Sequence, residues 1–295
     1  MRHGVVILPE HSWSQARKLW RQAEEFGFDH AWTYDHLVWR WLSDKPWFGA
    51  VPTLTAAATA TSRIRLGTLV ANPGFRDPVA FAKEIMTLDD ISGGRIDCGV
   101  GAGGYDADLL REGRSSPAER SARFAEFVEL MDLVLRQDPS GYHGKFYTCP
   151  DLVLHPACVQ RPRVPLAVAA SGPAGMRLAA AHAQTWVTSG VPNGFELLPY
   201  ERAVPLVKDQ VRKLEDACAE IGRDPSTLGR LVLTGASMDG VLDSVESFRD
   251  CSGALAEAGV TDLVVHWPRP EFPFKARMDV FEDIARWNED HARST

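Results

Sequence analysis

The sequence predicts an α/β protein, a (β/α)8 TIM barrel with insertions after its second and fourth strands. Eight short apolar segments typical of strands are each followed by a segment with helical periodicity. A length of 295 residues suits one barrel of this kind, and no shift in composition marks a boundary. We therefore expect residues 1–295 to form a single domain. A doubly wound sheet is the alternative, because alternation alone does not prove that a sheet closes.

The predicted strands are apolar runs that stop at glycine, proline or polar residues. The second starts at residue 31 and ends at Asp35 and His36, and the third ends at Asn72-Pro73-Gly74. The fourth runs into Gly101. The third and fourth strands cover residues 64–71 and 96–100. The first, fifth, sixth, seventh and eighth strands cover residues 4–8, 166–170, 185–189, 231–236 and 262–266.

The predicted helices carry apolar residues on one face and have recognisable ends. Ser12 or Ser14 can cap the first helix and Gly27 ends it, while Pro52 lies near the start of the second. We place the helices at residues 12–26, 53–61, 78–91, 119–135, 174–183, 200–221, 244–258 and 277–288. Two segments interrupt the alternation: residues 102–117 are polar and irregular, and residues 141–163 suggest a hairpin-like insertion.

Composition excludes several classes of function. The formal charge of −7 is spread without long blocks, so neither nucleic acid nor an anionic membrane is an expected partner. No apolar run approaches the roughly 20 residues of a membrane span, and the N-terminus lacks a secretory pattern. The five cysteines form no C-x-x-C pair, which indicates reduced thiols in a cytoplasmic protein. No histidine or cysteine spacing indicates a metal site.

The end of the second strand carries the first candidate for chemistry. Asp35 and His36 follow an apolar strand directly, and strand ends are where parallel barrels place catalytic side chains. Adjacent residues on a regular strand point to opposite sides, so the two do not form a simple dyad with each other unless the strand has already ended. A turn-capping Asp35 beside an ordinary loop histidine is the alternative. The functional hypothesis gives His36 a proton-handling role and Asp35 a positioning role at a cofactor or the following loop.

Aromatic residues follow this pair. Trp39, Trp41 and Trp47 lie in the segment between the second strand and the next helix, and Tyr105 opens the later irregular insertion. Packing in the core is the alternative for any one of them. Their clustering between a strand and a helix favours an aromatic wall, with Trp39, Trp41 and Tyr105 facing a substrate.

Glycines end the fourth strand. Gly99-Val-Gly101-Ala-Gly-Gly104 matches the dinucleotide-binding pattern G-x-G-x-x-G, but an irregular segment follows where that pattern requires a helix. We interpret the stretch instead as a loop at the barrel mouth whose backbone, around Gly101, approaches an anion or a ring closely. The fifth and sixth strands also end in small residues, at Ala169-Ala-Ser-Gly172 and Thr188-Ser-Gly190. Packing against a helix would explain small residues at either strand end equally well. Small residues at the ends of two neighbouring strands favour a flat ring that lies across both.

Taken together, these motifs resemble the luciferase-like monooxygenase superfamily, and within it the branch that uses the deazaflavin coenzyme F420. The resemblance covers nearly the whole chain. It is carried by Tyr34-Asp-His-Leu37, Leu66-Gly-Thr-Leu-Val-Ala-Asn-Pro73, Gly94-Arg-Ile-Asp-Cys-Gly-Val-Gly-Ala-Gly103, Glu119-Arg120, His143-Gly-Lys-Phe-Tyr147, Gln160-Arg-Pro162 and Val168-Ala-Ala-Ser-Gly-Pro173.

The resemblance implies a ring bound at the carboxyl end of the barrel, a non-prolyl cis peptide at Leu69-Val70 behind that ring, and a homodimer. His36 matches the histidine that handles the proton in F420-dependent sugar-phosphate dehydrogenases. Those dehydrogenases carry a glutamate directly after the glycine of the fourth strand, where this chain has Ala102, and Arg40 stands where they carry a tryptophan. The residues at cofactor-contact positions of the family are Asp35, Val70, Asn72, Ala170, Ser171, Gly172, Ser189 and Gly190.

The sequence thus predicts an F420-dependent oxidoreductase that transfers hydride between C5 of the deazaflavin and a small organic substrate. His36 and Asp35 are the predicted catalytic residues. The first alternative is an FMN-dependent monooxygenase of the same fold that works with a separate flavin reductase. An alternative of another class is a flavin-binding protein without enzymatic activity.

Overall fold

The computed structural model describes residues 1–108, 115–139, 141–191, 196–235 and 237–292. Over these residues, parallel strands close a barrel in the order β1, β12, β10, β8, β7, β4, β3, β2. Because β1 pairs with both β12 and β2, the predicted barrel is confirmed and the doubly wound alternative is wrong. The barrel strands are β1 (Arg2–Val6), β2 (His30–Thr33), β3 (Arg65–Ala71), β4 (Ile96–Gly101), β7 (Leu166–Ala169), β8 (Thr185–Thr188), β10 (Gly229–Leu233) and β12 (Asp262–His266).

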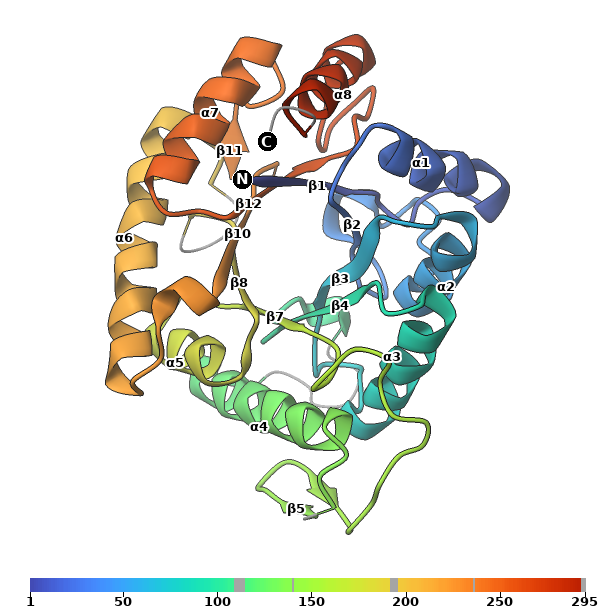
Figure 1. Ribbon diagram of the computed structural model, residues 1–295, viewed down its shortest axis with the longest axis vertical. Coiled ribbons are helices and arrows are strands. Elements are labelled where there is room, and N and C mark those ends of the chain that lie inside the picture. The colour runs from blue at the N-terminus through green and yellow to red at the C-terminus, as the bar shows by residue number, and fades with distance from the viewer. Residues whose placement is uncertain (109–114, 140, 192–195, 236, 293–295) are drawn as a thin grey trace.

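A helix follows each barrel strand, and Figure 1 shows these helices as a ring around the strands. The predicted helices are all present, with differences at their ends. The second helix begins at Ala50 rather than at residue 53, because Pro52 fits the first turn, where no helical partner for its missing N–H is needed. The helices are α1 (Trp13–Glu25), α2 (Ala50–Ala60), α3 (Pro78–Ser92), α4 (Pro117–Leu135), α5 (Pro173–His182), α6 (Tyr200–Glu220), α7 (Val245–Glu257) and α8 (Met278–Ala292).

The strand ends also differ from the prediction by a few residues. The first strand spans Arg2–Val6 rather than residues 4–8. The seventh barrel strand spans Gly229–Leu233 rather than residues 231–236, and Ala236 lies outside the described residues. At the first strand, the apolar and buried Ile7 and Leu8 follow the last paired residue, so hydrophobicity alone marks that strand end too late.

The core has two layers. The outer layer packs helices on the barrel and includes the fully buried Trp20, Phe81 and Phe127. The inner layer fills the barrel, where large side chains of β2 lie against glycines of the neighbouring strands. A Cβ on Gly67 would lie 2.4 Å from the Trp32 ring, and a Cβ on Gly4 would lie 2.0 Å from the His30 ring. The glycines therefore make room for two aromatic rings inside the barrel.

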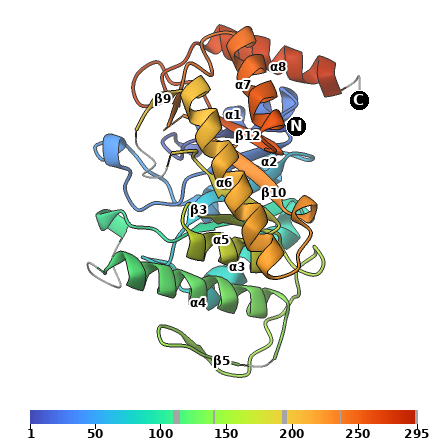
Figure 2. The same cartoon turned by 90° about the vertical axis from the view of Figure 1, so that its left-hand side faces the viewer.

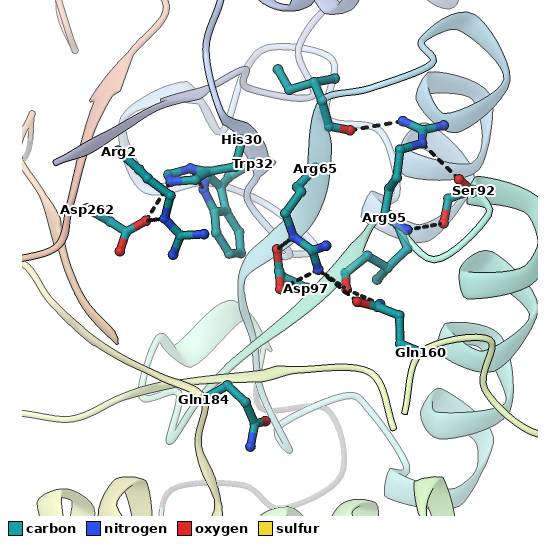
Figure 3. Close-up of polar contacts among 12 residues, drawn as sticks. Arg2, His30, Trp32, Arg65, Ser92, Arg95, Asp97, Gln160, Gln184 and Asp262 are labelled. Atoms are coloured by element: carbon teal, nitrogen blue, oxygen red, sulfur yellow. Dashed lines mark hydrogen bonds and ion pairs between the residues drawn. The ribbon is translucent and has the colours of Figure 1, made fainter. Parts of the chain in front are cut away.

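Polar side chains close the amino end of the barrel (Figure 3). Trp32 Nε1–H donates to His30 Nδ1 at 2.7 Å, and His30 Nε2 lies 2.9 Å from Asp262 Oδ1, which Arg2 also contacts at 2.8 Å. Beside this group, Arg65 donates to both oxygens of Asp97 at 2.7 and 2.9 Å. These residues fill one end of the barrel with paired charges and leave the other end for the insertions.

The insertion after α4 is the predicted hairpin, β5 (Tyr142–His143) with β6 (Thr148–Cys149). Figures 1 and 2 both place it outside α4. The Glu126 carboxylate of α4 accepts hydrogen bonds from the backbone N–H groups of residues 145, 146 and 147. The hairpin is therefore fastened to the outer surface of the barrel, away from the strand ends.

The segments around the barrel mouth contain short elements. After β2 lies the 3-10 turn η1 (Arg40–Leu42), and after β4 lies η2 (Asp106–Asp108). There too β9 (Leu198–Pro199) pairs with β11 (Met238–Asp239), whereas the turn η3 (Pro225–Thr227) precedes β10 and lies at the amino end of the barrel. All five cysteines are buried and unpaired, as predicted. No helix among the described residues is long and apolar enough to cross a membrane.

Candidate active site

The predicted site residues gather at the carboxyl end of the barrel. Asp35 and His36 follow β2, Val70 and Asn72 lie at the end of β3, and Gly101 ends β4. Because all barrel strands are parallel, these ends meet on one side of the sheet. The small residues predicted to contact a ring follow the next two strands: Ala170, Ser171 and Gly172 after β7, and Ser189 and Gly190 after β8.

His36 is held by a buried carboxylate from another segment. Its Nδ1 lies 2.5 Å from Oδ2 of Asp108, and the Leu37 N–H donates to Oδ1 of the same carboxylate at 2.9 Å. The side chain of Asp108 is 1% exposed and that of His36 is 17% exposed. The imidazole therefore has one fixed edge and remains partly accessible. Asp108 was not among the predicted site residues.

Asp35 is 2% exposed and faces Arg76, which donates to both of its oxygens at 3.0 and 2.8 Å. Arg76 also contacts Glu84 of α3. Burial by itself would lower the pKa of Arg76, but the hydrogen bonds and charge of Asp35 raise it above its ordinary value. The pair fixes the loop after β3 against the end of β2. Contact between Asp35 and a cofactor stays a prediction.

The two side chains of the predicted Asp35–His36 motif thus have different partners. Because β2 ends at Thr33, both residues lie beyond the strand, and their different partners rather than strand alternation separate them. Arg76 lies in the turn after Pro73-Gly74 and was not predicted as a partner of Asp35. The sequence shows only that a positively charged residue follows the end of the neighbouring strand.

The carboxyl ends of β3, β4 and β7 form a surface of small and aliphatic groups, which we call the ledge; it includes Val70, Gly101, Ala169 and Gly172. A Cβ on Gly101 would lie 2.6 Å from Cγ2 of Val70 and 3.5 Å from Cβ of Ala169, so Gly101 lets these neighbours approach. A Cβ on Gly172 would meet no atom within 4 Å, which means that this edge of the ledge is open. The peptide between Leu69 and Val70 is cis, as the family resemblance implies. An open ledge without bulky side chains fits a flat ring.

Other predicted cofactor residues already have internal partners. Asn72 is buried, its Oδ1 accepts from the Gly74 N–H at 2.9 Å, and its Nδ2 donates to Asp108 at 3.4 Å. The carbonyl of Ser189 accepts a hydrogen bond from the Ser237 hydroxyl. The backbone around these residues is therefore ordered by contacts within the chain.

The glycine stretch after β4 begins no helix. Gly103 and Gly104 have φ angles of 71° and 126°, in a region that favours glycine, and lead into the turn η2. This geometry agrees with the rejection of a dinucleotide fingerprint. It also carries Tyr105 and Asp108 back toward His36.

The predicted aromatic residues form a cluster around His36. The ring centroid of Trp39 lies 4.7 Å from that of His36, and the centroid of Tyr105 lies 6.0 Å away. Trp41 packs edge-on against Trp39 at 6.0 Å and is 39% exposed, while Trp47 stacks on Trp39. A wall beside His36 is therefore present, and its contact with a substrate stays a prediction.

The C-terminal part of the chain adds aromatic residues that the sequence did not single out. Phe272 packs against Trp41 at 5.1 Å, and Phe274 stacks on His266 at 3.6 Å between centroids. His266 also lies 2.7 Å from the Tyr34 hydroxyl through Nε2, and burial lowers its pKa to about 3. The His266 ring is therefore neutral, and its contacts with Tyr34 and Phe274 support the aromatic cluster from inside the barrel.

This combination of barrel, cis peptide and strand-tip motifs has known relatives. Residues 1–239 match the family described as luciferase-like monooxygenase. The chain belongs to this family. The match confirms the resemblance that the sequence motifs carry.

Proteins similar to this chain include enzymes whose names state that they depend on coenzyme F420. The F420-dependent glucose-6-phosphate dehydrogenase of Amycolatopsis mediterranei is 32% identical over 210 residues, which are 68% of this chain and 60% of that protein. The 5,10-methylenetetrahydromethanopterin reductase of Methanopyrus kandleri is 28% identical over 276 residues, 89% of this chain and 73% of that protein. A solved F420-dependent secondary alcohol dehydrogenase, in complex with an F420-acetone adduct, shares the fold with a TM-score of 0.78 at 20% identity, covering 96% of this chain and 97% of that one.

Proposed function

We propose that this protein is an F420-dependent oxidoreductase that transfers hydride between C5 of the deazaflavin and a small organic substrate. The observation that carries the proposal is a partly exposed histidine beside an open ledge of small side chains. His36 is joined through Asp108 to Asn72 at the end of β3, next to Val70 on the ledge. Similarity to an F420-dependent glucose-6-phosphate dehydrogenase and to a 5,10-methylenetetrahydromethanopterin reductase supports the choice of reaction class.

In this proposal the bound deazaflavin supplies or accepts the hydride. The protein's residues hold and orient the two reactants and move a proton. Val70 and the open edge from Ala170 to Gly172 support the ring, and the ion pair of Asp35 with Arg76 orders the loop beside it. Nε2 of His36 exchanges a proton with the substrate.

The substrate side of the proposed site is apolar. Trp39 and Tyr105 pack against His36 and Trp41 packs against Trp39, and the three would exclude water from the reacting atoms. Arg40 lies over the Tyr105 ring, at 5.1 Å from its centroid. We propose that the enzyme acts as a homodimer on a small molecule, as the family resemblance suggests, and that it is cytoplasmic, as its unpaired cysteines suggest.

Cofactor titration tests the choice of cofactor. Purified protein is titrated with F420 and, separately, with FMN, and binding is followed by quenching of cofactor fluorescence. We expect saturable binding of F420 and much weaker binding of FMN. Tight FMN binding without a response to F420 would favour the monooxygenase alternative, which the family description also supports.

Substitution of His36 tests the chemistry. A screen of small alcohols, aldehydes and ketones, followed by the absorbance of F420, identifies a substrate. General acid–base help is worth about 10²–10⁴-fold, so we expect His36→Ala to lose that factor in kcat and to keep its affinity for F420. His143→Ala, which removes an exposed histidine on the outer hairpin, is the matched control and should keep full turnover. Full turnover of His36→Ala would remove His36 from the mechanism.

A further inference from the structure

Asp108 is the buried carboxylate that reaches His36. It ends η2, in the insertion after β4, and comes from a part of the chain 72 residues away from His36. The residue directly after the glycine of β4 is Ala102, so no carboxylate extends from the strand tip itself. The carboxylate beside the imidazole is supplied by the loop instead.

The Asp108 side chain has hydrogen-bond contacts with three described residues, Leu37, Asn72 and His36. Leu37 N–H donates to Oδ1 and Asn72 Nδ2 donates to Oδ2, so both oxygens accept. An ionised carboxylate has no hydrogen to donate. With an ionised carboxylate, the third contact, at 2.5 Å, has His36 Nδ1 as the donor and Asp108 Oδ2 as the acceptor.

We propose that Asp108 is the positioning residue of His36, a role that rests on the proposed function of the imidazole. With Nδ1–H bound to Asp108, the neutral ring exposes Nε2 as the atom that accepts a proton. The same contact prevents rotation of the ring between its two edges. Among the described residues, Nε2 of His36 has no hydrogen-bond partner, so it is available to a substrate.

A purely structural role for Asp108 makes a different prediction. Its bonds to Leu37 N–H and Asn72 would then serve only to hold the loop, and its loss would lower stability regardless of the residue at position 36. A positioning role makes the effect of Asp108 depend on His36. A double-mutant cycle separates the two because it measures this dependence directly.

The cycle compares wild type, His36→Ala, Asp108→Asn and the double variant with a substrate from the screen. An asparagine is nearly the same size, but its amide can present N–H groups to Nδ1 and so disfavour the required tautomer. We expect Asp108→Asn to lower kcat by roughly 10- to 100-fold, by analogy with the loss of partners that orient metal-binding histidines. Affinity for F420 should not change, and Asp108→Asn should cause no further loss in the His36→Ala background. Additive losses would overturn the proposal.

Nuclear magnetic resonance of ¹⁵N-histidine-labelled protein tests the same contact without cofactor or turnover. The His36 signals are those absent from His36→Ala. We expect the neutral ring of the wild type to carry its hydrogen on Nδ1, and Asp108→Asn to lose this preference. A wild-type ring protonated on Nε2 would overturn the proposal even if Asp108→Asn does not fold. Failure to bind F420 would refute the proposed function, whereas the tautomer decides the role of Asp108.

Asp132→Asn is the matched control. Asp132 lies on α4, outside the barrel, and its Oδ2 is 3.1 Å from Nδ1 of His182, so it forms another aspartate–histidine pair remote from the site. Its loss should lower stability and leave kcat and the His36 signals unchanged. An equal fall in kcat for both aspartate variants would mean that destabilisation explains the effect, and the positioning role would be rejected.

Discussion

Asp262 at the closed end of the barrel provides a quantitative test of the polar layer in Figure 3. Burial by itself would raise the pKa of this carboxyl, but hydrogen bonds from His30 and Thr261 and the charge of Arg2 lower it from 3.8 to about 2. Each pKa unit corresponds to about 1.36 kcal/mol. The ionised carboxylate therefore contributes roughly 2 kcal/mol to the free energy of unfolding at neutral pH.

The sign of the pH dependence follows from the lowered pKa. The contribution is complete above the ordinary pKa of 3.8 and is lost as pH falls toward 2, because the unfolded chain then binds the proton more readily. Asp262→Asn mimics the protonated carboxyl. We expect it to lower the free energy of unfolding by roughly 2 kcal/mol at about pH 7 and by about half as much at about pH 3.

The assay is urea unfolding of wild type and variant at both pH values, followed by tryptophan fluorescence. Arg2→Gln is the control: Arg2 is 52% exposed, so its removal should cost no more than about 1 kcal/mol. Cofactor affinity should not change in either variant, because both residues lie at the end of the barrel opposite the site. An equal loss of stability at both pH values would refute the ionic account of this layer.

Two further substitutions test the mouth of the barrel. Gly101→Ala places a Cβ 2.6 Å from Cγ2 of Val70, so Val70 must move. We expect the free energy of unfolding to fall by about 1–3 kcal/mol and the quenching of F420 fluorescence to weaken. Unchanged quenching would show that Val70 does not support the ring. Tyr34→Phe removes the hydroxyl that pairs with the buried Nε2 of His266. It should lower the free energy of unfolding by about 1–3 kcal/mol in urea while F420 affinity is kept, and an unchanged unfolding midpoint would contradict a supporting role for that pair.

The barrel could be predicted because its pattern is local and repeated. Apolar runs ending at glycine, proline or polar residues mark the strands, and the capping residues Asp77 and Ser116, each followed by a proline, occupy the starts of α3 and α4. Exact ends were less predictable. Ladder hydrogen bonds depend on the neighbouring strand, so strand β1 ends at Val6 although Ile7 and Leu8 are apolar and buried.

The position of the site could also be predicted, because residues that follow parallel strands must share one end of the barrel. Asp35, His36 and the small tips after β7 were found for this reason. Arg76 and Asp108 were not, since an isolated charge in a loop has the same appearance in sequence whether it faces solvent or a buried partner. Phe274 was missed because it lies beyond the last strand, in a segment without periodicity.

The sequence by itself determined the alternation, the direction of the strands and the chemical groups at their carboxyl ends. The tertiary structure decided which group meets which: His36 meets Asp108 across 72 residues, Asp35 meets Arg76 across 41, and Tyr34 meets His266 across 232. Such pairs form only when the barrel closes and brings the loops of separate strands to one rim. Hydrophobic periodicity is a property of neighbours along the chain, whereas the partner of a buried charge is a property of neighbours in space.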